Sequence, residues 1–66
     1  MKLRMDEADD ALYIRLQESE IVESEEVSPG VVLDFDAGGR VVGVEMLNIR
    51  QRLPEADLKR VEVELA

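Results

Sequence analysis

Residues 31–46 read VVLDFDAGGRVVGVEM, and this stretch predicts a β-hairpin. Apolar residues recur at every second position on both sides of a glycine-rich centre, as in strands that bury one face. The two apolar rows are Val31, Leu33 and Phe35, and Val42, Val44 and Met46. Pairing Leu33 with Val44 puts all these side chains on one face. Phe35 then lies opposite Val42, and Ala37–Arg40 forms the loop. A shift of one residue would put glycine and glutamate on the apolar face, so we expect the first register.

The same pattern predicts a second hairpin at the N-terminus. Its apolar rows are Leu3 and Met5, and Leu12, Ile14 and Leu16. If Met5 lies opposite Leu12, Glu7–Asp10 is the loop, where aspartate side chains stabilise the turn. Residues 21–27 are predicted to form a further strand, which ends at the type II turn signature Pro29-Gly30.

The tail completes the expected fold. Pro54 is expected to begin a helical turn, with Leu58 docked onto the sheet. The alternation of Val61, Val63 and Leu65 with glutamates predicts a last strand, so the helical turn and this strand occupy residues 54–65. We expect a single domain, residues 1–66, of class α+β and β-rich. Its architecture is a small antiparallel meander sheet of five to six strands with a short C-terminal helical segment packed on it.

The register also predicts the core. One buried face is expected to hold Leu12, Ile14, Leu33, Phe35 and Val44. Asp34 and Glu45 are expected to be exposed or at an edge.

The composition indicates a small acidic protein of the cytoplasm. Sixteen acidic side chains outnumber eight basic ones, for a formal net charge of −8 in 66 residues. Residues 1–39 hold 3 basic and 11 acidic side chains, whereas residues 40–66 hold five of each. An acidic surface repels phosphate backbones, so we expect no nucleic-acid partner. We interpret Arg50, Arg52, Lys59 and Arg60 as a solvated helix face rather than an RNA site. No apolar run is long enough for a signal peptide or a membrane span, so we expect no membrane association.

The chain lacks the side chains that most catalytic sites use. It contains no histidine and no cysteine. This composition excludes disulfides, zinc sites of the Cys/His type and nucleophile–histidine pairs. Phosphate-binding glycine loops are also absent. We therefore expect no enzymatic activity, no catalytic residues and no cofactor.

One pattern is similar to a calcium loop. Counted from Asp34 as position 1, positions 3, 6, 8 and 12 are Asp36, Gly39, Val41 and Glu45, as in an EF-hand. Position 5, which normally supplies an oxygen ligand, is Gly38, and the flanks alternate as strands rather than helices. We therefore interpret the stretch as a plain hairpin and assign no metal site. The acidic loop over residues 6–10 remains a candidate for weak binding of a hard cation.

Apolar residues on both sheet faces indicate a partner. Val31-Val32, Val41-Val42 and Ile21-Val22 each place an apolar side chain on both faces. One tail cannot cover both faces, so a second copy or a different protein is expected to supply the other cover. We expect a homodimer. The candidate partner-facing residues are Tyr13, Val32 and Val41, although Tyr13 could instead contact the C-terminal tail.

Several segments together resemble a known family. They are LRMDEADDALYIRL at residues 3–16, VESEEVSPGVVLDFDAGGRVVGVEMLN at residues 22–48, and Arg52-Leu53-Pro54. The patterns D-x-x-x-D-x-L-Y-I-x-L and V-x-P-G-V-x-L-D-x-D-x-x-G-R-V-V-G-V-E are similar to those of short, uncharacterised bacterial and archaeal proteins, a domain-of-unknown-function family. The resemblance covers residues 1–54, and Met5 replaces an aromatic residue common in the family. It implies a small sheet-based fold and no established activity. Some relatives resemble partners in toxin–antitoxin gene pairs.

These observations favour a non-enzymatic protein–protein interaction module. It would act as a homodimer or as an acidic, antitoxin-like partner of a basic protein. The alternative is a domain that binds a hard cation or a small ligand weakly through its Asp/Glu loops.

Overall fold

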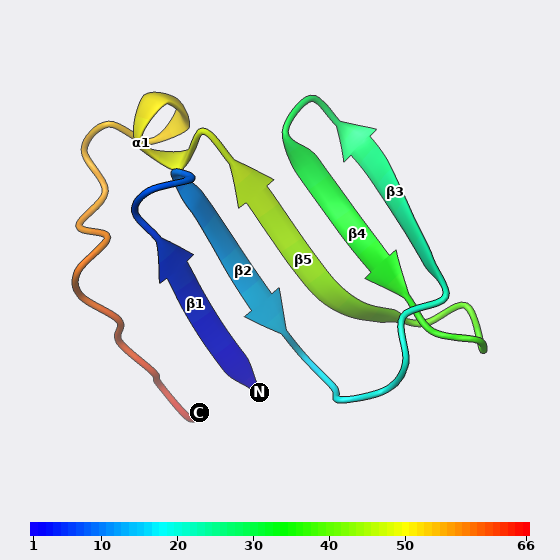
Figure 1. Ribbon diagram of the computed structural model, residues 1–66. Helices are drawn as coiled ribbons and strands as arrows, with labels where there is room; N and C mark the ends of the chain where they lie inside the picture. The colour runs from blue at the N-terminus through cyan, green and yellow to red at the C-terminus, as the bar shows by residue number, and fades with distance from the viewer.

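The computed structural model describes all 66 residues and contains five strands and one short helix. The elements are β1 (Lys2–Asp6), β2 (Ala11–Arg15), β3 (Glu23–Ser28), β4 (Val31–Phe35), β5 (Val41–Leu47) and α1 (Ile49–Arg52), as Figure 1 shows. All neighbouring strands are antiparallel. The predicted class, α+β and β-rich with a short C-terminal helical segment, is confirmed. The helix is too short to span a membrane.

The strands lie in the order β1-β2-β5-β4-β3. The chain forms one hairpin from β1 and β2, and then meanders through β3, β4 and β5. Residues 16–22 carry it from β2 to the far edge, and β5 returns to pair with β2. As a result, β5 is the central strand, and β1 and β3 are the two edges (Figure 1).

Both hairpin registers follow the hydrophobic pattern, with one correction. Met5 lies opposite Leu12 and Leu33 lies opposite Val44, as predicted. Phe35, however, lies opposite Val41 instead of Val42, because the register shifts between Asp34 and Phe35. This bulge leaves Val42 as the extra residue of β5, with its backbone carbonyl accepting hydrogen bonds from residues 16 and 17.

The loop of the second hairpin therefore begins one residue earlier than predicted, at Asp36. The Asp36 carboxylate accepts hydrogen bonds of 3.0 Å from the backbone N–H groups of Gly38 and Arg40. Gly39 has a φ of 76°, a conformation that glycine adopts without strain. The hydrogen bonds of this turn keep Asp36 in the loop. The strands accommodate the longer loop through the bulge, which leaves Val42 without a partner on β4.

The predicted structure of the tail is wrong in two respects. The helix spans Ile49–Arg52 and ends before Pro54, instead of beginning there. It starts early because the carbonyl and carboxylate oxygens of Asp10 accept hydrogen bonds from the backbone N–H groups of Ile49 and Arg50. The last strand, over Val61–Leu65, is not formed, and residues 53–66 contain only turns and extended chain.

The sheet is a single layer, and this changes the expected core. Helix α1 packs against the end of the sheet beside the β1–β2 loop, where Ile49 is fully buried, and it covers neither face (Figure 1). The predicted core side chains, Leu12, Ile14, Leu33, Phe35 and Val44, are only half-buried. Asp34, which was expected to be exposed, is instead 9% exposed, and Glu45 is half-buried on the central strand.

Candidate functional site: the two faces of the sheet

One face of the sheet is entirely apolar over four strands. Register and alternation place these side chains together: Leu3 and Met5 of β1, Leu12 and Ile14 of β2, Val44 and Met46 of β5, and Val31, Leu33 and Phe35 of β4. We call this set the apolar face. Most of its members are half-buried, and Leu3 at the edge is 43% exposed. Only the edge strand β3 adds charge there, through Glu23 and Glu25, which lie opposite Phe35 and Leu33.

The opposite face carries polar side chains in rows across the sheet. We call it the polar face, and its members include Arg4, Asp6, Ala11, Tyr13, Arg15, Ser24, Val32, Asp34, Gly43 and Glu45. Tyr13 and Val32 lie on either side of Glu45 in one such row. Ala11, Asp34 and Gly43 are buried, so this face is better packed than the apolar one.

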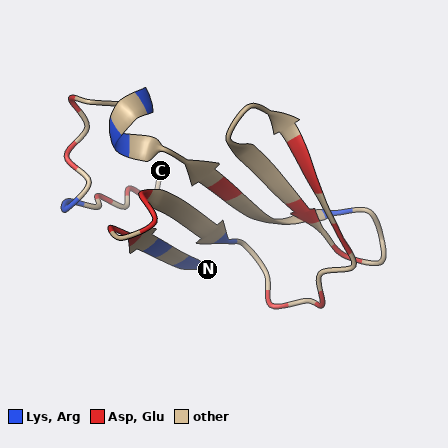
Figure 2. Cartoon of the chain, turned by 45° about the horizontal axis from the view of Figure 1, so that its top comes forward, with Lys and Arg blue, Asp and Glu red and all other residues tan.

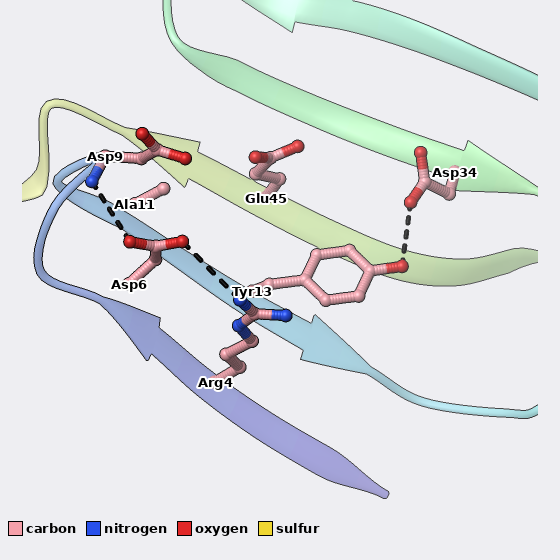
Figure 3. A pocket seen from close by; sticks show the side chains of 7 residues that line it. All are labelled: Arg4, Asp6, Asp9, Ala11, Tyr13, Asp34 and Glu45. Atoms are coloured by element: carbon pink, nitrogen blue, oxygen red, sulfur yellow. Dashed lines mark hydrogen bonds and ion pairs between the residues drawn. The ribbon is translucent and has the colours of Figure 1, made fainter.

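A hydrogen-bonded network centred on Asp34 stabilises the polar face. The Tyr13 hydroxyl donates to Asp34 Oδ2 over 2.9 Å (Figure 3). The Ser24 hydroxyl donates to Asp34 Oδ1 over 2.6 Å. Arg15 donates to the Tyr13 oxygen over 3.3 Å and also to the backbone carbonyls of Gln17 and Ser19. The bond to Tyr13 contributes most to raising the pKa of Arg15. The network therefore joins three strands, β2, β3 and β4, and the connection that follows β2.

Gly43 makes this network possible. A Cβ atom at this position would lie 2.6 Å from the Tyr13 hydroxyl oxygen and 2.9 Å from Asp34 Oδ2. Both distances are shorter than normal van der Waals contacts. A glycine in the middle of a central strand thus lets the Tyr13 ring cross β5 and reach Asp34. This role of Gly43 was not predicted, although a glycine between valines in a strand is the signal that could have indicated it.

A hollow of about 360 Å³ lies on the polar face beside this network. Its lining side chains are Arg4, Asp6, Asp9, Ala11, Tyr13, Asp34 and Glu45 (Figure 3). Asp6 accepts a hydrogen bond of 3.0 Å from the Asp9 backbone N–H and lies 3.6 Å from the Arg4 guanidinium. The carboxylates can accept further hydrogen bonds from cationic or amide donors.

The carboxylates do not gather as a metal site would require. No group of three or more acidic side chains lies close enough to hold a metal ion. In the calcium-like pattern, Asp34 bonds to Tyr13 and Ser24, whereas Asp36 bonds to its own loop and to the Arg40 guanidinium at 2.9 Å. Both side chains are thus used within the sheet and its hairpin.

Two ion pairs hold the loops. Arg40 lowers the pKa of Asp36, first through its backbone N–H and then through its guanidinium. Similarly, the side-chain hydrogen bond from Arg50 to Asp10, 2.8 Å long, lowers the pKa of Asp10 and raises that of Arg50. Asp10 has a φ of 52°, in the left-handed region, and the ion pair joins it to α1.

The predicted basic face of the tail is mostly engaged within the molecule. Arg50 also donates to the Glu7 carbonyl, Arg52 to the Pro29 carbonyl, and Arg60 to Glu62. Figure 2 shows basic residues in and after α1, and acidic residues along β3 and in the loops.

The three predicted partner-facing residues separate into two places. Tyr13 and Val32 share one row of the polar face, where both are half-buried. Val41 lies at the bulge beside the β4–β5 loop and is 39% exposed. The structure therefore brings Tyr13 and Val32 together but places Val41 apart from them.

Comparison with protein-family models gives one match, to a family described as "Protein of unknown function (DUF2283)", over residues 2–50. No curated protein and no solved structure matched the chain. The matched residues include all five strands and the start of α1. The chain therefore belongs to the DUF2283 family.

Proposed function

We propose that the protein is a non-enzymatic interaction module of the cytoplasm that works as a homodimer, in which two copies stack their apolar faces. The observation that carries the proposal is an apolar face without a second layer. Sheets with one apolar face normally bury it against another layer of structure. A chain of about 60 residues also buries only roughly 60% of its unfolded surface, so additional burial stabilises it substantially.

A second copy fits this face in size. The molecule measures 36 × 31 × 20 Å. The whole broad side of the molecule, with α1, the loops and the tail included, therefore covers on the order of 1,000 Å², an upper limit that exceeds the roughly 800 Å² per partner of a standard interface. Stacking related by a two-fold axis covers both apolar faces at once and forms a closed dimer.

Charge distribution supports the same partner. The apolar face carries glutamates only on β3, whereas the remaining acidic side chains lie on the polar face, in loops and connections, and in the C-terminal tail. Two copies with a formal charge of −8 each still repel one another. Because salt screens exposed charges over about 8–10 Å at physiological ionic strength, the dimer should be tighter there than at low salt.

Sedimentation equilibrium with two neighbouring variants tests the proposal. Leu33 and Val32 are both half-buried on β4 and point to opposite faces. Leu33→Lys places a cation at the centre of the stacked faces and should raise the dimer Kd by about 100-fold. Val32→Lys is the matched control and should leave the Kd almost unchanged.

Two further readouts make the result decisive. The Tm of the wild-type chain should rise with protein concentration, as expected when folding is linked to dimerisation. Circular dichroism spectra of both variants serve as the control that each chain is still folded. A wild-type monomer at all concentrations and salt levels would overturn the proposal. Dissociation by Val32→Lys but not by Leu33→Lys would move the interface to the polar face, where the sequence analysis placed Val32.

A further inference from the structure

The outer edge of β1 is an unpaired strand edge. β1 pairs only with β2, so the backbone N–H and C=O groups on its other side have no neighbouring strand. Unpaired edges of this kind bind extended segments by continuing the sheet. Alternate side chains of β1 are apolar, namely Leu3 and Met5, and basic, namely Lys2 and Arg4.

The C-terminal segment has the pattern of a strand without a sheet. Val61, Val63 and Leu65 alternate with Glu62 and Glu64. The three apolar side chains are largely exposed, and Val63 is 80% exposed. No residue from 61 to 66 takes part in a backbone hydrogen bond. Arg60 pairs instead with Glu62, two residues along the chain, at 3.3 Å.

The beginning of this segment already lies at the correct end of β1. Leu58 and Lys59 line a small hollow together with Met5, Glu7 and Arg50. In the view of Figure 1 the tail runs in the direction opposite to β1, whereas Figure 2 shows that its end lies away from the N-terminus. An antiparallel pairing with β1 therefore requires residues 60–65 to move onto the edge, while Leu58 and Lys59 keep their place beside Met5.

The side chains select one register. With Val63 opposite Leu3, every pair is either apolar with apolar or acidic with basic. The pairs are Met1 with Leu65, Lys2 with Glu64, Leu3 with Val63, Arg4 with Glu62, Met5 with Val61, and Asp6 with Arg60. Opposite charges and apolar pairs that face one another stabilise neighbouring strands, whereas like charges destabilise them.

The two nearest registers that keep the same faces are worse. A shift of two residues in one direction places Arg60 opposite Arg4, and the other shift places Glu62 opposite Asp6. In the structure, Arg4 pairs weakly with Asp6 at 3.6 Å, and Arg60 pairs with Glu62. The preferred register lets these four residues exchange partners without leaving any charge unpaired.

We propose that the free edge of β1 is a strand-binding site for extended segments of alternating apolar and acidic residues, and that residues 60–65 of the same chain occupy it. The docked tail is a second state of the chain, in which the edge is closed. Its valines extend the apolar face and its glutamates join the polar face. Closing the edge also prevents addition of another chain there.

Engineered cysteines test the register in the full chain, which contains no cysteine of its own. Residues directly opposite one another in antiparallel strands have the Cα separation that a disulfide needs, whereas residues shifted by two do not. In a glutathione buffer, Leu3→Cys/Val63→Cys should form an intrachain disulfide severalfold more readily than Leu3→Cys/Val61→Cys or Leu3→Cys/Leu65→Cys. Equal disulfide formation in all three variants would overturn the proposal.

Charge reversal distinguishes strand pairing between the tail and β1 from simple proximity of the two cysteines. Arg4→Glu should lower the disulfide yield of the Leu3→Cys/Val63→Cys chain severalfold, and adding Glu62→Arg should restore it. In the wild-type chain, amide hydrogen exchange should be slower at Val61–Leu65 than at residues 54–57. A disulfide between two chains instead of within one would show that a second copy is the occupant and would overturn the assignment to the same chain. Intrachain disulfides are scored on monomers, so the result does not depend on stacking of the apolar faces.

Discussion

The polar and apolar faces consist of alternate residues of the same strands, yet only the polar face is complete within one chain. The polar face buries Ala11, Asp34 and Gly43, and Asp34 has hydrogen-bond partners on both carboxylate oxygens. The apolar face leaves its members half-buried. Hydrogen bonds are directional and can be satisfied by neighbours in the same layer, whereas apolar burial requires a second layer. This difference is the reason why the proposed dimer buries the apolar face.

The largest expected loss of stability comes from a substitution on the apolar face. Phe35→Ala removes the only aromatic side chain of the apolar face. When a second copy buries that face, the loss of stability should be about 3–5 kcal/mol, as for a fully buried phenylalanine. In dilute solution the chain is a monomer, in which the Phe35 side chain is only half-buried. The loss of stability there should be roughly half of this value. Denaturant unfolding at low and high protein concentration measures both values.

Val32→Ala is the control for this prediction, because Val32 lies on the same strand as Phe35 but on the polar face. Its effect should not depend on protein concentration. A Phe35→Ala effect that stays the same at all concentrations would contradict stacking of the apolar faces.

A smaller effect is expected on the polar face. Tyr13→Phe removes the hydroxyl that donates to Asp34 and leaves a buried carboxylate oxygen without its partner. The loss should be about 1–3 kcal/mol and independent of protein concentration. Ser24→Ala removes the other donor, but Ser24 is exposed on β3, where water can replace the hydroxyl, so its effect should be smaller. Urea unfolding of both variants checks the order, and a larger loss from Ser24→Ala would show that Tyr13 is not the main partner.

Gly43→Ala tests the same network by crowding it. The added methyl group collides with the Tyr13 hydroxyl and with Asp34, so the variant should lose about 1–3 kcal/mol. In a Tyr13→Phe background the nearest of these atoms is absent, and the additional loss should be smaller. A double-mutant cycle in urea measures this coupling. Additive losses would mean that Gly43 is needed for another reason, such as the backbone of β5.

These residues also show which features of the fold can be predicted from the sequence. The pairing of Leu33 with Val44 and of Met5 with Leu12 was predictable, because a slip of one residue would invert the faces. The burial of Asp34 was not predictable from its own strand. It depends on Tyr13, 21 residues away in sequence, which reaches it across β5 over Gly43. Alternation identifies strands but does not order them, and the pairing of β2 with β5 follows only from the structure.

The loop and the tail illustrate the same limit. The bulge after Asp34 results from the hydrogen bonds of Asp36, which a purely hydrophobic register ignores. The early start of α1 results from Asp10, which lies about forty residues away in sequence and supplies acceptors for the first helical turn. The alternation of Val61–Leu65 is that of a strand, but a strand also needs a neighbour to pair with.

The smallest expected effect lies in the loops that border both faces, and it depends on pH. The pKa of Asp36 and that of Asp10 are lowered from an ordinary value of 3.8, by hydrogen bonds from Arg40 and Arg50 respectively. Because each carboxyl binds its proton less readily in the folded chain, each contributes stability that is fully present above the unfolded pKa. That stability is lost as the pH falls from this value through the folded pKa.

Asp36→Asn and Asp10→Asn should therefore flatten the acid limb of the stability curve, as measured by urea unfolding between neutral pH and about pH 2. Salt separates the two sites. The Asp36 carboxylate is almost fully buried, whereas Asp10 and Arg50 are more exposed, so added salt should weaken the contribution of Asp10 more. The double variant should show the sum of the two changes, since the loops lie at opposite ends of the sheet (Figure 1). An acid limb that keeps its wild-type slope in the double variant would show that neither ion pair differs between the folded and unfolded chain.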